Sequence, residues 1–324
     1  MADQWAAQVL QSVLGLLPGE TVAIAVDRPL ERAGRSLAAA ARELGAGAVE
    51  AHWLPSPGGR LAVVSSRLVQ AIAGADVVVT LLSRFDLGAE MPVMRAAMAA
   101  FRKQGRGRWA LGAGVDEPLL AEALAGDVRL VAEAARLLYE KLQGSVGVRI
   151  TTEAGTDLTL SWRDRPFHVE TGLLREPGSL GNLPGGEVYV APLEESAEGR
   201  LVVDVSLGDI PLDHPVVLTF RRGRVVHMEG SEAGRILLDR LGSGPWAWTV
   251  GEFGIGVNPF VPLRGVASVD EKALGTVHVA LGSNWRFGGV NRAASHYDCV
   301  ISGPRLWLQR EDGMVPLTLG SSKR

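Results

Sequence analysis

The sequence predicts an α/β protein in two parts, an N-terminal open parallel-sheet α/β domain over residues 1–144 and a β-rich α+β domain over residues 145–324. Three observations carry this prediction. The first 140 residues alternate helical and strand patterns, which is typical of repeated β-α-β units. From residue 145 onward, short apolar runs are separated by glycine and proline. The length of 324 residues also suits two domains.

The N-terminal part begins with an amphipathic helical pattern over residues 5–17, which Pro18-Gly19 ends. Residues 21–26 form a continuous apolar run, as buried parallel strands do. The segments that follow are predicted as helix 30–44, strand 48–53, helix 67–73, strand 76–82, helix 118–124 and helix 128–142. No Gly-x-Gly-x-x-Gly motif follows the first strand, so the dinucleotide-binding fingerprint is missing.

The C-terminal part is predicted to consist mainly of strands. Period-two or apolar runs bounded by turn residues occur at 146–151, 157–162, 187–191, 200–207, 216–220, 225–228, 276–281 and 297–302. Residues 232–241 give the one clear helical pattern. We expect this β-rich domain to carry the functional site.

Composition excludes several classes of protein. The formal net charge is −3 and 47% of residues are hydrophobic, which is unlike disordered chains and unlike nucleic-acid-binding proteins with a basic surface. The single cysteine, Cys299, excludes a disulfide-stapled fold. No apolar run reaches the roughly 20 residues of a membrane helix, and the first residues lack the basic region of a signal peptide. We therefore expect a cytoplasmic protein without nucleic-acid or membrane partners.

The strongest candidate site combines histidine and aspartate on predicted strands. His296 and Asp298 stand at i and i+2, so on a strand both side chains project from one face. His278 alternates with Val277 and Val279 and is expected on the opposite face from those valines. The connection over residues 282–291 is rich in glycine and amide residues, as loops that approach a ligand closely are.

Two glutamates occur in settings that would hold them rigidly. Glu187 opens a predicted strand after a glycine-rich turn, and Glu252 lies between glycines. Together with His278, His296 and Asp298 they form a ligand set that suits zinc, manganese, iron or cobalt at one or two sites. If two ions bind, one carboxylate would bridge them and a metal-bound water would act as the nucleophile. Glu252 or Glu187 would then be the general base. The alternative to a metal site is a structural role, in which a histidine at a strand end is hydrogen-bonded to a carboxylate and the glutamates lie on the surface beside turns.

At these residues the sequence resembles aminopeptidase T and aminopeptidase S, a family of metal-dependent aminopeptidases. The shared blocks, in order, are Leu17-Pro-Gly-Glu-Thr-Val22, Gly155-Thr-Asp-Leu158, Asn182-Leu-Pro-Gly-Gly-Glu-Val-Tyr-Val-Ala-Pro192, Gly251-Glu252, the stretch from Asp270-Glu-Lys272 to His278-Val-Ala-Leu-Gly282, and His296-Tyr-Asp298. The resemblance implies two divalent ions, zinc, cobalt or manganese, held by Glu187, Glu252, His278, His296 and Asp298. It also implies a small peptide substrate and a homodimer.

The sequence departs from this family at two positions. Trp285 stands where the peptidases have a tyrosine, seven residues after the first ligand histidine, so that hydroxyl is missing. Lys272 stands where they typically have asparagine. Asp270, Glu271 and Lys272 are candidates to orient the ligand histidine. Trp285, Arg286 and Arg292 are candidate substrate-binding residues, because a guanidinium suits a carboxylate or carbonyl.

Two other functions remain open. The 2,5-dihydroxypyridine 5,6-dioxygenases are similar in fold and keep the later histidines and aspartate as ligands to one ferrous iron. His278, His296 and Asp298 would satisfy this two-histidine, one-carboxylate arrangement. The third possibility is a binding or structural protein that keeps the fold without activity. Cys299 adjoins Asp298 and is expected to pack in the core rather than act as a nucleophile.

Overall fold

The computed structural model describes residues 3–54, 66–84, 91–230, 232–244 and 246–319. The chain forms two compact units, residues 1–132 with 171–185 and residues 133–170 with 186–324. These units differ from the predicted domains in two places. Residues 133–144 join the second unit, and residues 171–185 return to the first because their short strand pairs with its sheet. Local sequence patterns do not reveal such a return of the chain.

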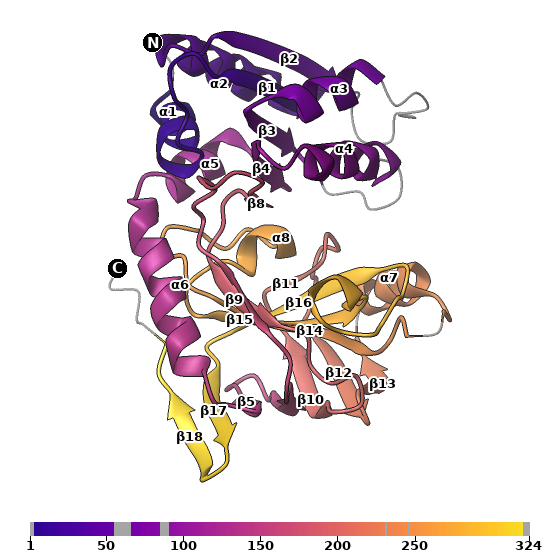
Figure 1. Ribbon diagram of the computed structural model, residues 1–324. Coiled ribbons are helices and arrows are strands. Elements are labelled where there is room, and N and C mark those ends of the chain that lie inside the picture. The colour runs from indigo at the N-terminus through magenta and orange to yellow at the C-terminus, as the bar shows by residue number, and fades with distance from the viewer. Residues whose placement is uncertain (1–2, 55–65, 85–90, 231, 245, 320–324) are drawn as a thin grey trace. The chain divides into compact units, whose positions relative to one another are not determined.

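The first unit contains the predicted open parallel sheet. Within the described residues its strand order is β2-β1-β3-β4-β8, and all the pairings are parallel (Figure 1). The strands are β1 Thr21–Asp27, β2 Ala48–Leu54, β3 Val77–Leu82, β4 Arg108–Ala113 and β8 Leu180–Asn182. Strands β4 and β8 were not predicted, because a six-residue run containing glycine and a three-residue strand carry little periodicity.

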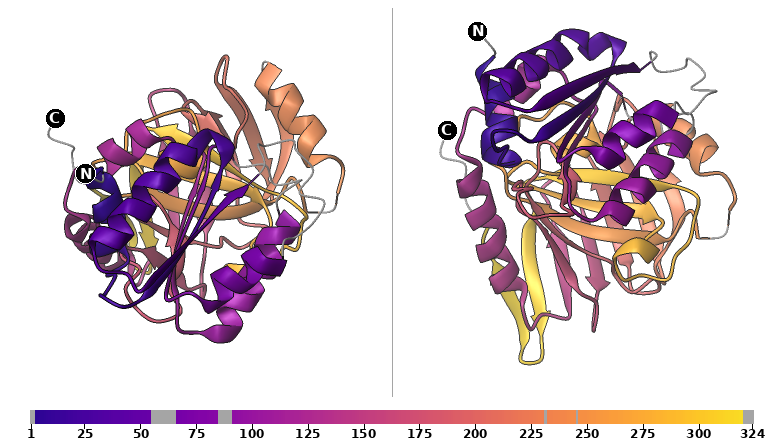
Figure 2. Two further views of the ribbon diagram at one scale, coloured as in Figure 1. Left: turned by 90° about the horizontal axis from the view of Figure 1, so that it is seen from above. Right: turned by 45° about the horizontal axis from the view of Figure 1, so that its top comes forward.

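Helices cover both faces of this sheet, as the β-α-β pattern predicts. Gly34 of α2 (Glu31–Glu43) lies against Val26, where an added Cβ would be 2.7 Å from Val26 Cγ2. On the other face, Ile72 of α3 (Ser66–Gly74) and Phe101 of α4 (Met91–Gln104) share a buried cluster with Trp109. Figure 2 (left) shows α2 in indigo on one side of the strands and the purple α3 and α4 on the other.

The remaining helices follow predicted segments with altered ends, except the short η2 and α8, which were not predicted. They are α1 Gln4–Gln8, the π-helical turn η1 Val9–Val13, the 3-10 turn η2 Arg28–Leu30, α5 Glu117–Ala123, α6 Val128–Leu142, α7 Glu232–Leu241 and α8 Ala267–Asp270. The predicted helix 5–17 therefore ends at Val13. The Asp116 carboxylate accepts a hydrogen bond from the Leu119 backbone N–H and caps α5. No helix of the described residues is long and apolar enough to cross a membrane.

The second unit is built from two antiparallel sheets, which confirms its predicted β-rich character. In the described part of the chain one sheet has the order β13-β12-β10-β6-β5-β17-β18 and the other β11-β16-β15-β14-β9-β7. The strands of the first are β5 Gly147–Thr151, β6 Asp157–Ser161, β10 Glu198–Val203, β12 Val216–Arg221, β13 Arg224–Glu229, β17 Arg305–Arg310 and β18 Gly313–Leu317. Those of the second are β7 Phe167–Glu170, β9 Glu187–Val190, β11 Ser206–Leu207, β14 Val250–Gly256, β15 Thr276–Gly282 and β16 His296–Ser302.

The six-stranded sheet has one apolar and one polar face. Its apolar face packs in the core, where Phe253 stacks on Trp162 with ring centroids 5.4 Å apart. Val277, Val279 and Cys299 lie on this face and are fully buried, which confirms the predicted core position of Cys299 and the predicted placement of the valines opposite His278. Because side chains alternate along a strand, the residues between them point to the opposite, polar face. The register of the sheet therefore decides which polar residues meet.

Candidate metal centre

All five predicted metal ligands lie on the polar face of the six-stranded sheet. Glu187 is on β9, Glu252 on β14, His278 on β15, and His296 and Asp298 on β16. The register pairs His278 with Gly254 and Asp298 with Ala280, so small residues stand opposite the ligands. An alanine Cβ at Gly254 would lie 2.1 Å from His278 Cε1, which means that only glycine leaves room for this imidazole.

The central strand β14 was not predicted, although Glu252 on it was. Its sequence Val-Gly-Glu-Phe-Gly-Ile-Gly is rich in glycine, which weakens the strand signal. The structure explains the glycines as places of close approach. At Gly256, for example, a Cβ would lie 2.2 Å from the Ala273 carbonyl oxygen.

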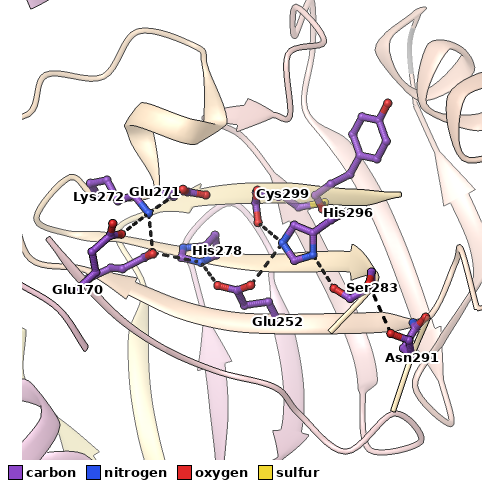
Figure 3. Close-up of polar contacts among 12 residues, drawn as sticks. Glu170, Glu252, Glu271, Lys272, His278, Ser283, Asn291, His296 and Cys299 are labelled. Atoms are coloured by element: carbon purple, nitrogen blue, oxygen red, sulfur yellow. Dashed lines mark hydrogen bonds and ion pairs between the residues drawn. The ribbon is translucent and has the colours of Figure 1, made fainter. Parts of the chain in front are cut away.

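The Glu252 carboxylate lies between the two imidazoles (Figure 3). Its Oε1 is 3.3 Å from His278 Nε2, and its Oε2 is 3.3 Å from His296 Nε2. His296 Nε2 is also 3.2 Å from Asp298 Oδ1. Both Nε2 atoms thus face the same group of carboxylate oxygens. This convergence of nitrogen and oxygen donors is what a divalent metal ion requires.

A backbone carbonyl on the side of the ring away from the carboxylates fixes the orientation of His296. Its Nδ1 lies 2.8 Å from the Ser283 carbonyl oxygen, and because a carbonyl only accepts, Nδ1 carries the proton. Nε2 is therefore left as the lone-pair nitrogen of the neutral ring, as metal-bound histidines usually are. His278 also directs Nε2 toward the carboxylates, whereas its buried Nδ1 makes no hydrogen bond.

The electrostatics of the cluster favour positive charge between these carboxylates. Burial disfavours the imidazolium form of His278, but the hydrogen bond to Glu252 and the charge of Glu187 outweigh it and raise its pKa to about 9. Burial opposes the same change at His296, where Asp298 and Glu252 raise the pKa well above its ordinary value. In the absence of a metal, protons on the two rings balance the carboxylates.

The cluster also contains a buried lysine. The Lys272 side chain is 1% exposed, and its Nζ is 2.6 Å from Glu187 Oε1, 2.8 Å from Glu271 Oε1 and 2.9 Å from Glu170 Oε2. Although burial disfavours the charged form, these three carboxylates raise the pKa of Lys272 well above its ordinary value. Lys272 was predicted to orient a histidine; it pairs with the carboxylates instead.

Asp270 and Glu271, the other two candidates for orienting the ligand histidine, lie in different environments. Asp270 accepts hydrogen bonds from the backbone N–H groups of Arg264 and Val266, at 2.6 and 3.0 Å, and so holds a turn. Burial raises the pKa of Glu271 to about 7. Glu170 was missed because it belongs to no motif. It enters the cluster only through the register that pairs it with Glu187.

The residues present fit a divalent metal ion. Three groups bring one ligand atom per residue within 4.8 Å of one another: Glu187, Glu252 and His278; Glu252, His296 and Asp298; and Glu271, His278 and Asp298. In addition, Glu187 Oε2 is buried without a hydrogen bond and lies 3.5 Å from His278 Nε2. An acceptor left in this position is satisfied when a cation binds.

The predicted substrate-binding residues lie on the connection after β15. Trp285 begins the turn η3 (Trp285–Phe287) and is 44% exposed. The guanidinium carbons of Arg286 and Arg292 lie 5.4 and 4.7 Å from its ring centroid, so the three residues form an exposed cation-π cluster. The structure thus brings all three predicted residues together.

A second aromatic group, which sequence reasoning missed, lies beside His296. Phe287 is 6.1 Å from His296 between ring centroids, and 5.6 Å from Tyr189. Tyr189 stacks on His168 at 5.1 Å, and His168 Nε2 lies 3.0 Å from the Phe287 carbonyl oxygen. These half-buried rings form an aromatic wall, defined here as His168, Tyr189 and Phe287.

Glu194 anchors the connection that carries Phe287. Its Oε1 accepts hydrogen bonds from Asn284 Nδ2 and the Val290 N–H, at 3.0 and 2.7 Å, and its Oε2 pairs with Arg165 at 2.8 Å. Gly289 allows this closure, since a Cβ there would lie 1.9 Å from the Asn284 side chain. The glycine-rich loop was predicted to approach a ligand closely. In the structure Gly289 instead packs against the Asn284 side chain of the same loop.

Comparisons with known proteins identify the family. The model of the NicX family, described as 2,5-dihydroxypyridine 5,6-dioxygenase, matches residues 2–316. A 2,5-dihydroxypyridine 5,6-dioxygenase of Pseudomonas putida KT2440 is 27% identical over 184 residues, which is 52% of this chain and 52% of that protein. The sequence match thus spans about half the length of this curated relative.

Two solved structures resemble nearly the whole chain. The structure of 2,5-dihydroxypyridine dioxygenase from Pseudomonas putida KT2440 has a TM-score of 0.74 at 21% identity and covers 97% of this chain and 95% of its own. Wild-type AmpT from Thermus thermophilus also has a TM-score of 0.74, at 19% identity, and covers 98% and 97%. At these identities both matches show the fold.

The resemblance to aminopeptidase T therefore holds for the fold, and the peptidase family itself is not established. The family match covers almost all of the sequence, and the curated relative carries the same family name. The alternative named from His278, His296 and Asp298 is thus better supported than the aminopeptidase prediction. The chain belongs to the 2,5-dihydroxypyridine 5,6-dioxygenase family.

Proposed function

We propose that the protein is a ring-cleaving dioxygenase for a hydroxylated aromatic ring of the dihydroxypyridine type. His278, His296 and Asp298 would hold one metal ion, most suitably ferrous iron. The observation that carries this proposal is the convergence of two Nε2 atoms on the carboxylate oxygens of one sheet face. Two histidines and one carboxylate with open coordination positions are the ligand set of non-haem iron oxygenases.

Ferrous iron bound by these residues would supply the activation of dioxygen. Glu252 is then available as a proton acceptor for a ring hydroxyl. In the metal-free centre burial alone would raise its pKa, but hydrogen bonds from His278 and His296 lower it, and a cation bound to these rings would favour the same ionised form. An ionised carboxylate beside a bound substrate is a suitable general base.

The aromatic wall supports a planar substrate. Phe287 presents its ring edge-on to His296, and Tyr189 and His168 continue the surface along the row of Gly254 and His278. Aromatic pairs prefer such offset or edge-to-face contacts, each contributing about 1 kcal/mol beyond buried area. A peptide backbone would gain little from this surface, whereas a hydroxypyridine ring matches it.

The second candidate is the metal-dependent aminopeptidase expected from the sequence resemblance, with two ions and a peptide substrate. The presence of both Glu187 and Glu252 in the cluster favours it. However, Glu187 Oε1 lies 2.6 Å from the Lys272 ammonium, so one oxygen of this carboxylate already has a cationic partner. This contact favours the single-metal function.

Elemental analysis of protein purified without chelators, combined with two activity assays, distinguishes the candidates. The dioxygenase proposal predicts one metal per chain, oxygen uptake with 2,5-dihydroxypyridine and ferrous iron, and no release of amino acids from peptides. His296→Ala should abolish oxygen uptake, whereas the control His214→Ala should not, because the His214 side chain is 80% exposed. Two metals per chain with peptide cleavage would establish the aminopeptidase instead.

A further inference from the structure

The connection between β15 and β16 carries two groups that contact His296. The Ser283 carbonyl oxygen accepts a hydrogen bond from His296 Nδ1 at 2.8 Å, which leaves Nε2 facing the carboxylates. The Phe287 ring lies 6.1 Å from the His296 ring and belongs to the aromatic wall. Whatever fixes this connection therefore sets both the orientation of a metal ligand and the surface beside it.

The direction of the Ser283 carbonyl depends on the residue that follows it. Because a peptide bond is planar, the Ser283 C=O and the Asn284 N–H share one plane and point in opposite directions. The Asn284 N–H donates to the Asn291 carbonyl oxygen at 3.0 Å. Ser283 Oγ donates to the same oxygen at 3.5 Å, and Figure 3 shows the contacts from His296 through Ser283 to Asn291. Asn284 and Asn291 thus aim the carbonyl at His296.

Asn284 is fully buried and closes the connection on itself. Its Oδ1 accepts a hydrogen bond from the Asn291 N–H at 2.8 Å, and its carbonyl oxygen accepts from the N–H groups of Phe287 and Gly289 at 3.2 and 3.0 Å. Its side-chain nitrogen is directed out of the connection and donates to Glu194 Oε1 at 3.0 Å. Glu194 therefore holds the residue on which the shape of the connection depends.

Glu194 contacts the connection at other points as well. Its Oε1 accepts a hydrogen bond from the Val290 N–H at 2.7 Å, and its Oε2 pairs at 2.8 Å with Arg165, which donates to the Gly288 carbonyl oxygen. The side chains of Glu194 and Arg165 are 8% and 13% exposed, so water competes little for these bonds. The guanidinium also compensates the buried carboxylate charge.

We propose that Glu194 is a positioning residue of the metal centre. Through Asn284 it fixes the Ser283 carbonyl that orients His296, and it fixes the turn η3 that presents Phe287. The effect on His296 concerns metal binding and is independent of the reaction. The effect on Phe287 rests on the proposed function, in which the aromatic wall contacts the substrate. Loss of a hydrogen-bonding group that supports a ligand histidine typically costs about 10- to 100-fold in metal affinity.

The zinc affinity of protein freed of metal tests the effect on His296. Glu194→Ala removes the support of Asn284 and should weaken zinc binding by about 10-fold or more in isothermal titration. Glu194→Gln keeps an oxygen for Asn284 and Val290, so it should bind zinc more tightly than Glu194→Ala. The control is Glu195→Ala, because the neighbouring Glu195 side chain is 75% exposed and pairs with Arg222. Its zinc affinity should equal that of the wild type.

NMR and kinetics separate positioning from a general loss of stability. In the zinc-loaded wild type, the His296 Nδ1 proton should give a slowly exchanging signal that is absent in His296→Ala. In Glu194→Ala, measured well below its melting temperature, this proton should exchange faster with water. With saturating ferrous iron the KM for 2,5-dihydroxypyridine should also rise in Glu194→Ala, because Phe287 is less firmly placed.

Wild-type zinc affinity and an unchanged His296 Nδ1 signal in folded Glu194→Ala would overturn the proposal, since Glu194 would then only stabilise the fold. An equal loss of affinity in Glu195→Ala would overturn it too. If Glu194→Ala does not fold, Glu194→Asp carries the same test, because it keeps a charge for Arg165 but withdraws the carboxylate from Asn284 by one methylene. Wild-type zinc affinity in that variant would overturn the proposal. A wild type that binds zinc but takes up no oxygen with ferrous iron refutes only the proposed function.

Discussion

Replacing Gly254 by alanine should disable the centre without removing any ligand. The new Cβ would lie 2.1 Å from His278 Cε1 and 2.2 Å from its Nε2. Non-bonded carbon atoms need about 3.5 Å, so the imidazole has to move by more than about 1 Å. His278 is fully buried, and its strand is paired on both sides, which leaves the ring little room to yield.

The size of the effect follows from this displacement. A misplacement of about 1 Å at a reacting centre costs about 100-fold in rate, and overpacking a dense site costs about 1–3 kcal/mol in stability. We therefore expect Gly254→Ala to lose at least about 100-fold in oxygen uptake and to bind metal more weakly. Isothermal titration with manganese and an oxygen electrode measure the two effects.

A matched control separates this effect from a general cost of alanine. Gly244 has no atom within 4 Å of an added Cβ and no positive φ, so Gly244→Ala should leave metal affinity and oxygen uptake unchanged. If Gly254→Ala bound manganese with wild-type affinity and kept its activity, His278 would not be part of the metal centre. The ligand assignment would then have to be abandoned.

Three further predictions use other parts of the site. Glu252→Gln should keep one metal per chain but lower oxygen uptake by about 100-fold or more, as loss of a general base does; loss of the metal would instead make Glu252 a ligand. Chelation should lower the melting temperature of the wild type but not that of His296→Ala, and equal shifts in a thermal scan would argue against a metal held by His296. Burial opposes ionisation of Glu194, but the Val290 N–H and Asn284 lower its pKa below 4.5. Its contribution to stability is therefore complete above pH 4.5 and is lost as the pH falls through the lowered value, so Glu194→Gln should flatten the acid limb of the stability curve, and an unchanged limb would exclude this role.

The fold was largely predictable because its elements carry strong local signals. The buried parallel strands β1 and β3 are continuous apolar runs, and the alternation around Val277 and Val279 places His278 on the polar face. Strand β14 was missed because the glycines that make room for His278 and for the Ala273 carbonyl also weaken the strand pattern. The return of residues 171–185 to the first unit depends on long-range pairing, which no local period encodes.

The site was predictable where spacing within one strand determines it. His296 and Asp298 are such a pair; His278, Glu187 and Glu252 were candidates from their local settings, and the resemblance to a metalloenzyme family indicated the same five residues. Residues that enter through register between strands, such as Glu170, were not predictable. The partner of Lys272 is a three-dimensional property as well, since Glu170 and Glu187 are distant from it in sequence. The homodimer and the cytoplasmic location stay predictions.

The most direct test of the account is the reaction itself. Protein loaded with ferrous iron should be mixed with 2,5-dihydroxypyridine under isotopically labelled dioxygen, and the product analysed by mass spectrometry. The account predicts a ring-opened product that contains both labelled oxygen atoms, and its absence in His296→Ala. An unchanged substrate with wild-type protein that holds one iron per chain would contradict the dioxygenase function.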